Sequence, residues 1–126
     1  TPRSKFIYKK IGPSLNEYNE LLESAKKGAT KSKIFLFTYP AHKNSYTKEL
    51  SNQLIHLYPK KLVIVGRIKQ SDYILSLRST EIDIPKLLEQ ALIGINGRGG
   101  GHKNAVGASI SIADFDRFLD NIKSQL

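Results

Sequence analysis

The sequence predicts a small α/β domain in which helices flank a mixed β-sheet of about four to five strands. Two short, continuous apolar runs are typical of strands that are covered on both faces, and a segment with helical periodicity lies between them. A third run alternates apolar and polar residues and follows the second run after a short link, which predicts a hairpin. The length of 126 residues and the hydrophobic content of 40% suit one domain with a core of its own.

Residues 1–30 are predicted to form a linker and a connecting helix. Residues 1–13 are basic and end in a glycine–proline pair that breaks regular structure. Ser14 and Glu17 have the spacing of a capping box, and the apolar residues after them recur at helical spacing as far as Gly28. The chain contains no methionine. We therefore expect it to be a piece of a longer protein, with residues 1–30 leading from a missing N-terminal domain.

A strand, a helix and a second strand are predicted next. Residues 34–37 form the first apolar run, which Pro40 closes. Residues 45–58 carry one apolar stripe at helical spacing and stop at Pro59. Residues 62–65 form the second apolar run. Because a strand–helix–strand crossover joins parallel strands, we expect these two strands to be parallel.

The C-terminal half is predicted to add an antiparallel strand, a helix, a last strand and a final helix. Residues 73–78 form the alternating strand, and residues 83–92 form a helix that opens with an aspartate and a proline. Residues 108–112 are predicted to be the last strand. Ser111 and Asp114 have the spacing of a second capping box, which predicts the start of the final helix.

The glycines are concentrated in one segment, since six of the nine lie between residues 94 and 107. We predict that residues 96–108, NGRGGGHKNAVGA, form a glycine-rich binding loop. Consecutive glycines lose much backbone entropy on folding, so they are typical of places where φ is positive or where a group approaches the backbone closely. Successive amides in such a turn can bind an anion, and the side chains beside them can donate to phosphate: Arg98, His102, Lys103 and Asn104. The alternative is a flexible connection with solvated charges.

Two common nucleotide-binding motifs are excluded for this segment. A P-loop requires a Gly-Lys-Ser/Thr sequence that opens a helix, and the chain has none. A dinucleotide-binding fingerprint follows the first strand of a β-α-β unit, whereas this segment follows a helix near the C-terminus.

The composition narrows the class of protein further. The 20 Lys and Arg residues exceed the 11 Asp and Glu residues, and the net charge of +9 favours binding to polyanions. The lack of cysteine excludes disulfides, thiolate chemistry and cysteine-based zinc sites, and it suits a reducing compartment, so we expect a cytoplasmic location. No apolar run has the length of a membrane span or the pattern of a secretory leader, so we expect no signal peptide and no membrane partner.

Two motifs make the sequence similar to a known family. Residues 99–108 resemble the Gly-Gly-Gly-His-x-x-Ala-x-Gly signature of the DHH-associated domain. This is the C-terminal, substrate-binding domain of DHH-family phosphoesterases, which include RecJ-like exonucleases and small oligoribonucleases. The strand end at residues 76–79 resembles the Ser-x-Arg-Ser motif of the same family. The resemblance covers roughly residues 34–126. Alanyl-tRNA synthetases carry a related glycine-rich domain, but it is not similar at the position of His102, so the resemblance to DHH-family phosphoesterases ranks higher.

The resemblance implies that residues 31–126 are the DHH-associated domain of a metal-dependent phosphoesterase. The missing N-terminal DHH domain would hold divalent metal ions, manganese or magnesium, and this chain would hold no metal and no catalytic residue. Its partner would be single-stranded nucleic acid or a short oligonucleotide. Side-chain alternation places Ser76 and Arg78 on one strand face, and the Arg78 fork suits phosphate oxygens. The implied substrate-binding residues are Ser76, Arg78, Arg98, Gly99, Gly100, Gly101, His102, Lys103 and Asn104.

The sequence leaves two alternatives open. The chain has no Asp-His-His motif, and its three histidines lie apart from acidic clusters, so we expect the fragment alone not to hydrolyse a substrate. The parent enzyme can act instead on small phosphoesters, such as a cyclic dinucleotide, phosphoadenosine phosphate or polyphosphate. The domain can also be a stand-alone module that binds nucleic acid or protein.

Overall fold

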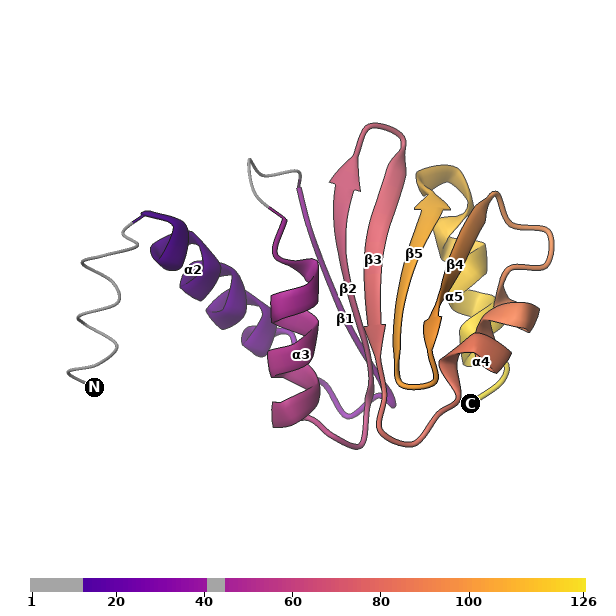
Figure 1. Cartoon of the computed structure of the whole chain (residues 1–126), viewed down its shortest axis with the longest axis horizontal. Coiled ribbons are helices and arrows are strands. Elements are labelled where there is room, and N and C mark those ends of the chain that lie inside the picture. Colours follow the sequence, from indigo (N-terminus) through magenta and orange to yellow (C-terminus); the bar gives the residue numbers. More distant parts are fainter. Residues whose placement is uncertain (1–12, 41–44) are drawn as a thin grey trace.

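The computed structural model describes residues 13–40 and 45–126, which fold into a five-stranded mixed sheet with helices on both faces (Figure 1). This arrangement confirms the predicted α/β class. In chain order the elements are α2 (Pro13–Lys27), β1 (Ile34–Tyr39), α3 (Thr47–Leu57), β2 (Leu62–Lys69), β3 (Asp72–Arg78), α4 (Ile84–Ala91), β4 (Gly97–His102), β5 (Ala105–Ser111), a 3-10 turn (Ile112–Asp114) and α5 (Phe115–Lys123). Residues 1–12 of the predicted linker, and the Ser14 side chain of the first capping box, lie outside the described part.

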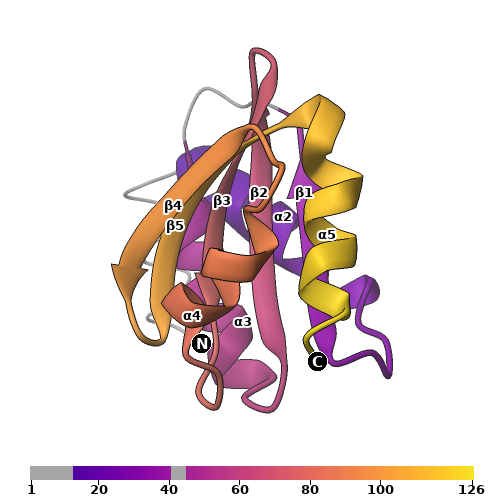
Figure 2. The ribbon, with the colours of Figure 1, turned by 90° about the vertical axis from the view of Figure 1, so that its right-hand side faces the viewer.

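The strands follow the order β1-β2-β3-β5-β4, so the glycine-rich strand β4 lies at one edge of the sheet (Figure 2). β1 pairs with β2 in parallel, and β2 pairs with β3 in an antiparallel hairpin. Both predictions are therefore confirmed. The remaining pairs, β3 with β5 and β5 with β4, are antiparallel.

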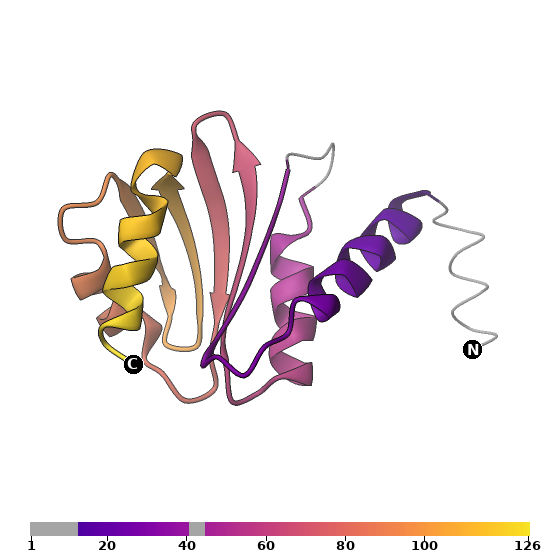
Figure 3. The same ribbon diagram turned by 180° about the vertical axis from the view of Figure 1, so that it is seen from behind.

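Two apolar clusters cover the two faces of the sheet. One cluster joins the sheet to α4 and α5, with Leu77 of β3 and Phe118 of α5 fully buried (Figure 3). The other joins β1 and β2 to α2 and α3, with Leu50 and Val65 fully buried. α3 lies over β2 and β3, and no helix of the described residues lies in front of β5 and β4 on that side (Figure 1). The α3 side of the sheet is therefore open at β5 and β4.

The glycine-rich segment is an edge strand, so the prediction of a loop is wrong. Gly97–His102 pairs with β5, and only residues 103 and 104 form the connecting turn. A Cβ on Gly97 would lie 2.7 Å from the carbonyl oxygen of Ser109, and one on Gly99 would lie 3.1 Å from Cδ1 of Leu88. Glycine is therefore required where β4 passes close to β5 and α4.

The two helix starts predicted in the C-terminal half differ in outcome. Asp83 caps α4 as predicted, because its carboxylate accepts the backbone N–H of Lys86 at 3.3 Å. The capping box of Ser111 and Asp114 is not formed, since neither side chain caps the helix that follows it. The Asp114 carboxylate instead accepts the backbone N–H of Asn96 at 2.7 Å and a bond from Arg117 at 2.6 Å. Asp114 thus fixes the residue that precedes β4.

The carboxylate of Asp114 is expected to make the stability of the domain depend on acid pH. The Asn96 N–H bond, and then Arg117, hold the pKa of Asp114 below its usual value of 3.8. A lowered pKa in the folded state adds stability above the unfolded value, and this stability is lost as the pH falls through the folded value. Urea unfolding should show that Asp114→Asn is less stable than the wild type at pH of about 6, with a smaller difference at pH of about 3. A difference that stays constant with pH would contradict this assignment.

Candidate functional site

Most of the predicted site residues lie on the α3 side of the sheet, which is uncovered at β4 and β5 and which we call the open face. Ser76 of β3 is only 4% exposed on this side, where α3 lies over β2 and β3. Cross-strand partners point to the same side of a sheet, and residues two apart on one strand share a face. The open face therefore consists of three rows, each crossing β4, β5 and β3 in that order: Arg98–Ser109–Ile74, Gly100–Gly107–Ser76 and His102–Ala105–Arg78. The structure thus brings together Ser76, Arg78, Arg98, Gly100 and His102.

The middle row of the open face carries no side chain larger than a hydroxymethyl group. A Cβ on Gly100 would meet nothing within 4 Å, and one on Gly107 would meet only the carbonyl oxygen of Leu75, at 3.9 Å. The packing of the domain therefore does not require glycine at either position, in contrast to Gly97 and Gly99. A hollow of about 310 Å³ lies over this floor, and a second hollow of about 420 Å³ adjoins it towards α3.

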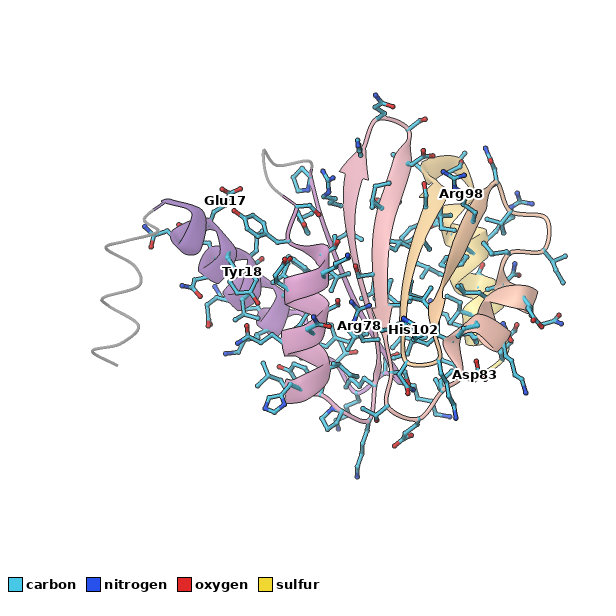
Figure 4. The ribbon with its side chains drawn as sticks, in the orientation of Figure 1. Glu17, Tyr18, Arg78, Asp83, Arg98 and His102 are labelled. Atoms are coloured by element: carbon cyan, nitrogen blue, oxygen red, sulfur yellow. The ribbon has the colours of Figure 1, made fainter. Side chains whose placement is uncertain are left out.

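Basic side chains stand at both ends of the floor (Figure 4). Arg78 and His102 occupy one outer row, and Arg98 occupies the other. The two outer rows cross β3 at Ile74 and Arg78, a spacing of four positions along the strand, which corresponds to about 13 Å. The nine residues of the three rows include no acidic side chain, although Glu49 lines the adjoining hollow. The open face therefore favours an elongated anion.

The guanidinium of Arg78 is held in one orientation by three protein oxygens. Its Nε donates to Oδ1 of Asn52 at 2.7 Å, and its Nη1 donates to the carbonyl oxygen of Leu77 at 2.9 Å and, more weakly, to that of Val106 at 3.5 Å. Partial burial lowers the pKa of Arg78, yet an arginine keeps its charge in proteins. Within residues 13–40 and 45–126, Nη2 has no hydrogen-bond partner. Its two N–H groups are available to a ligand.

The other predicted site residues do not share the open face. Gly99 and Gly101 lie on the opposite face of β4, as alternation requires. Lys103 is exposed in the turn between β4 and β5. Asn104 fixes that turn, because its Nδ2 donates to the carbonyl oxygen of Ile82 at 3.3 Å and its own carbonyl accepts the N–H of Ser79. A role of these four residues in binding stays a prediction.

Two residues of α3 beside the open face were missed by the sequence-based prediction. Lys48 lines the hollow towards α3, and Asn52 contacts Arg78. Their spacing of four residues places them on one flank of the helix. The only sequence signal is a polar flank beside the apolar stripe, which does not reveal the strand that it faces.

The part of the chain that the structure describes contains no group of three or more His, Cys, Asp or Glu residues that could hold a metal ion. The residues present therefore do not fit the pair of metal ions that the resemblance implies for the parent enzyme. None of the described helices is long and apolar enough to cross a membrane.

The sheet order and the open face define a small α/β domain with one uncovered sheet surface beside a helix. The family model of the DHHA1 domain matches residues 32–126. The chain therefore belongs to the DHHA1 domain family, which confirms the resemblance to the DHH-associated domain.

Solved structures with the same fold include two enzymes and one tRNA synthetase domain. RecJ from Thermus thermophilus in complex with Mg²⁺ has a TM-score of 0.66 and 19% identity, over 87% of this chain and 18% of that one. The pGpG-specific phosphodiesterase PggH from Vibrio cholerae has a TM-score of 0.57 and 16% identity, over 87% of this chain and 39% of that one. The C-Ala domain of Aquifex aeolicus alanyl-tRNA synthetase has a TM-score of 0.58 and 12% identity, over 73% of this chain and 86% of that one.

At these identities the likenesses show the fold alone. The chain spans about a fifth of the Thermus RecJ chain that it matches. A search of curated protein sequences gave no significant match.

Proposed function

We propose that the chain is the substrate-binding domain of a DHH-family phosphoesterase, and that its open face binds the phosphate-bearing end of a single-stranded nucleic acid or short oligonucleotide. The observation that supports this proposal is the floor of Gly100 and Gly107, where the fold leaves room for a side chain and the sequence supplies none. A glycine that packing does not require is typical of a place where a ligand approaches the backbone.

The charges around the floor support a phosphate ligand. The free Nη2 edge of Arg78 can donate two bonds to phosphate oxygens, and arginine is suited to binding phosphate through paired bonds of this kind. His102 lies in the same row, and Arg98 lies at the other end of the floor, within reach of a second phosphate. Lys48 adds positive charge from α3. The remaining positive charge of the chain would add attraction that is independent of sequence.

The hydrolytic chemistry of the parent would come from a DHH domain joined through residues 1–30. Divalent metal ions bound there would activate water and stabilise the charge that develops on the phosphate. The matching RecJ structures contain Mg²⁺ or manganese. This division of labour requires that the gene encoding the chain also encode an Asp-His-His motif upstream of Thr1. A gene without that motif would leave the open face as a stand-alone binding module.

A small phosphoester is the second candidate ligand, because the fold is shared with a phosphodiesterase described as pGpG-specific. The two basic rows lie about 13 Å apart, so a dinucleotide and the end of a longer strand can occupy the same floor. Competition distinguishes them. A mononucleotide or dinucleotide that displaces a longer strand at equal concentration favours the small phosphoester, whereas affinity that rises with length favours the strand.

We expect the 126-residue chain to bind single-stranded oligonucleotides with an affinity that falls as salt rises. Arg78→Ala and His102→Ala should each lower the affinity about tenfold, because each removes a donor to phosphate, while both variants stay folded. Arg78→Ala also loses the three hydrogen bonds of its guanidinium within the domain, so we expect its thermal unfolding midpoint to fall slightly. Fluorescence anisotropy with an oligothymidylate of about ten nucleotides measures this effect.

The matched control for this experiment is Lys86→Ala, which removes one positive charge from the exposed surface of α4, on the other side of the sheet. It should change the affinity by less than about twofold. A loss as large as that of Arg78→Ala would mean that binding depends on overall charge, and the proposed site would be wrong.

A further inference from the structure

We infer that Asn52 of α3 is a positioning residue of the open face, which orients the guanidinium of Arg78 without neutralising its charge. This inference rests on the proposed function of the open face. It assigns a role in ligand binding to a helix that carries neither of the two family motifs.

The guanidinium of Arg78 has hydrogen-bond partners on the strand side and on the helix side. The side chain leaves β3 at the end of the strand, where the carbonyl oxygens of Leu77 and Val106 can fix only Nη1. The bond from Nε to Oδ1 of Asn52, at 2.7 Å, is the shortest of the three and restrains the guanidinium from the opposite element. With Nε and Nη1 both engaged, the plane of the fork is set and Nη2 is left for the ligand. An unrestrained arginine would lose much more rotamer entropy when it binds.

The chemistry of the partner matters as much as its position. A neutral amide oxygen accepts the Nε–H bond and leaves the arginine with its full positive charge. A carboxylate at the same place would form an ion pair with Arg78 and would compete with a phosphate for the remaining donors. An asparagine therefore suits a site in which the arginine must remain attractive to an anion.

The adjacent residue provides a matched control. Gln53 is exposed on the same helix and also uses its amide oxygen as an acceptor, here for the hydroxyl of Tyr18 at 2.6 Å. That bond joins α3 to α2, whereas the Asn52 bond joins α3 to β3. Asn52→Ala therefore removes an amide side chain that contacts the open face, and Gln53→Ala removes one that contacts α2 instead.

A double-mutant cycle on the full 126-residue chain tests this role. The probe is a 5′-phosphorylated, 3′-labelled oligothymidylate of about ten nucleotides, and the readout is its dissociation constant at several salt concentrations. We expect Asn52→Ala to weaken binding about fivefold in the wild type and to have no further effect when Arg78 is already alanine. Gln53→Ala should leave the affinity unchanged in both backgrounds.

Asn52→Asp separates orientation from charge and keeps the shape of the side chain. It should weaken binding more than Asn52→Ala does. The negative slope of log affinity against log salt should become shallower by about one, as it should for Arg78→Ala. Thermal unfolding midpoints near that of the wild type would show that both variants fold.

The outcomes distinguish this inference from the proposed function. If Arg78→Ala binds as well as the wild type, the proposed function of the open face fails. If Arg78→Ala weakens binding but Asn52→Ala does not, or if Asn52→Ala weakens it equally in the Arg78→Ala background, only the role of Asn52 is overturned.

Discussion

Replacing Gly101 by alanine is expected to lower the free energy of unfolding by about 3 kcal/mol, combining backbone strain with a steric clash. The φ of Gly101 is +153°, a conformation that residues with a side chain rarely adopt. A Cβ would also lie 2.6 Å from the carbonyl oxygen of Ala105 and 3.0 Å from the Cα of Val106. Both contacts are with the backbone of β5, so no side-chain rotation can relieve them, and the β4–β5 hairpin must distort.

Gly100→Ala is the control for this prediction, since it makes the same change one residue earlier. Its Cβ would meet nothing within 4 Å, so we expect its free energy of unfolding to stay within about 0.5 kcal/mol of the wild type. Urea unfolding of the two variants, followed by circular dichroism, provides the comparison. Equal stability of the two variants would show that the backbone at Gly101 accommodates a side chain, contrary to the conformation described.

Strand β4 shows where prediction of the fold from sequence fails. β1, β2 and β3 were predicted because apolar or alternating residues mark them, and the Asp83 cap marks the start of α4. β4 has the sequence GRGGGH, which contains no β-branched residue and no Phe, Tyr or Trp. Strand formation here depends on pairing with β5 and on the close approach of α4, and context of this kind overrides local propensity.

The prediction of a loop in place of strand β4 also limits the prediction of the site. Side-chain alternation along a recognised strand placed Ser76 and Arg78 together, and the structure confirms this. A loop has no such alternation, so the predicted loop does not distinguish the three consecutive glycines from one another. As a strand they divide, with Gly100 on the open face and its two neighbours on the opposite face. The contribution of α3 depends on how the helix lies across the sheet, which no local pattern in the sequence encodes.

Replacing Gly100 by valine is expected to lower the affinity for the oligothymidylate about a hundredfold, or roughly 2.8 kcal/mol. The isopropyl group would stand on the floor between the two basic rows, where the proposed ligand crosses the sheet. Nothing lies within 4 Å of a Cβ at this position, so we expect the valine to fit without disturbing the packing of the domain. Valine also favours strands more than glycine does, so we expect the thermal unfolding midpoint to be equal to that of the wild type or higher.

A graded series distinguishes obstruction of the floor from a general effect of the substitution. Gly100→Ala should weaken binding less than Gly100→Val, and Gly107→Val should act like Gly100→Val because the two residues pair across β4 and β5. Gly28→Val adds the same side chain after α2, outside the open face, and should bind like the wild type. A folded Gly100→Val variant with wild-type affinity would show that the ligand does not cross this floor. The bare glycines would then need another explanation, because the packing of the domain provides none.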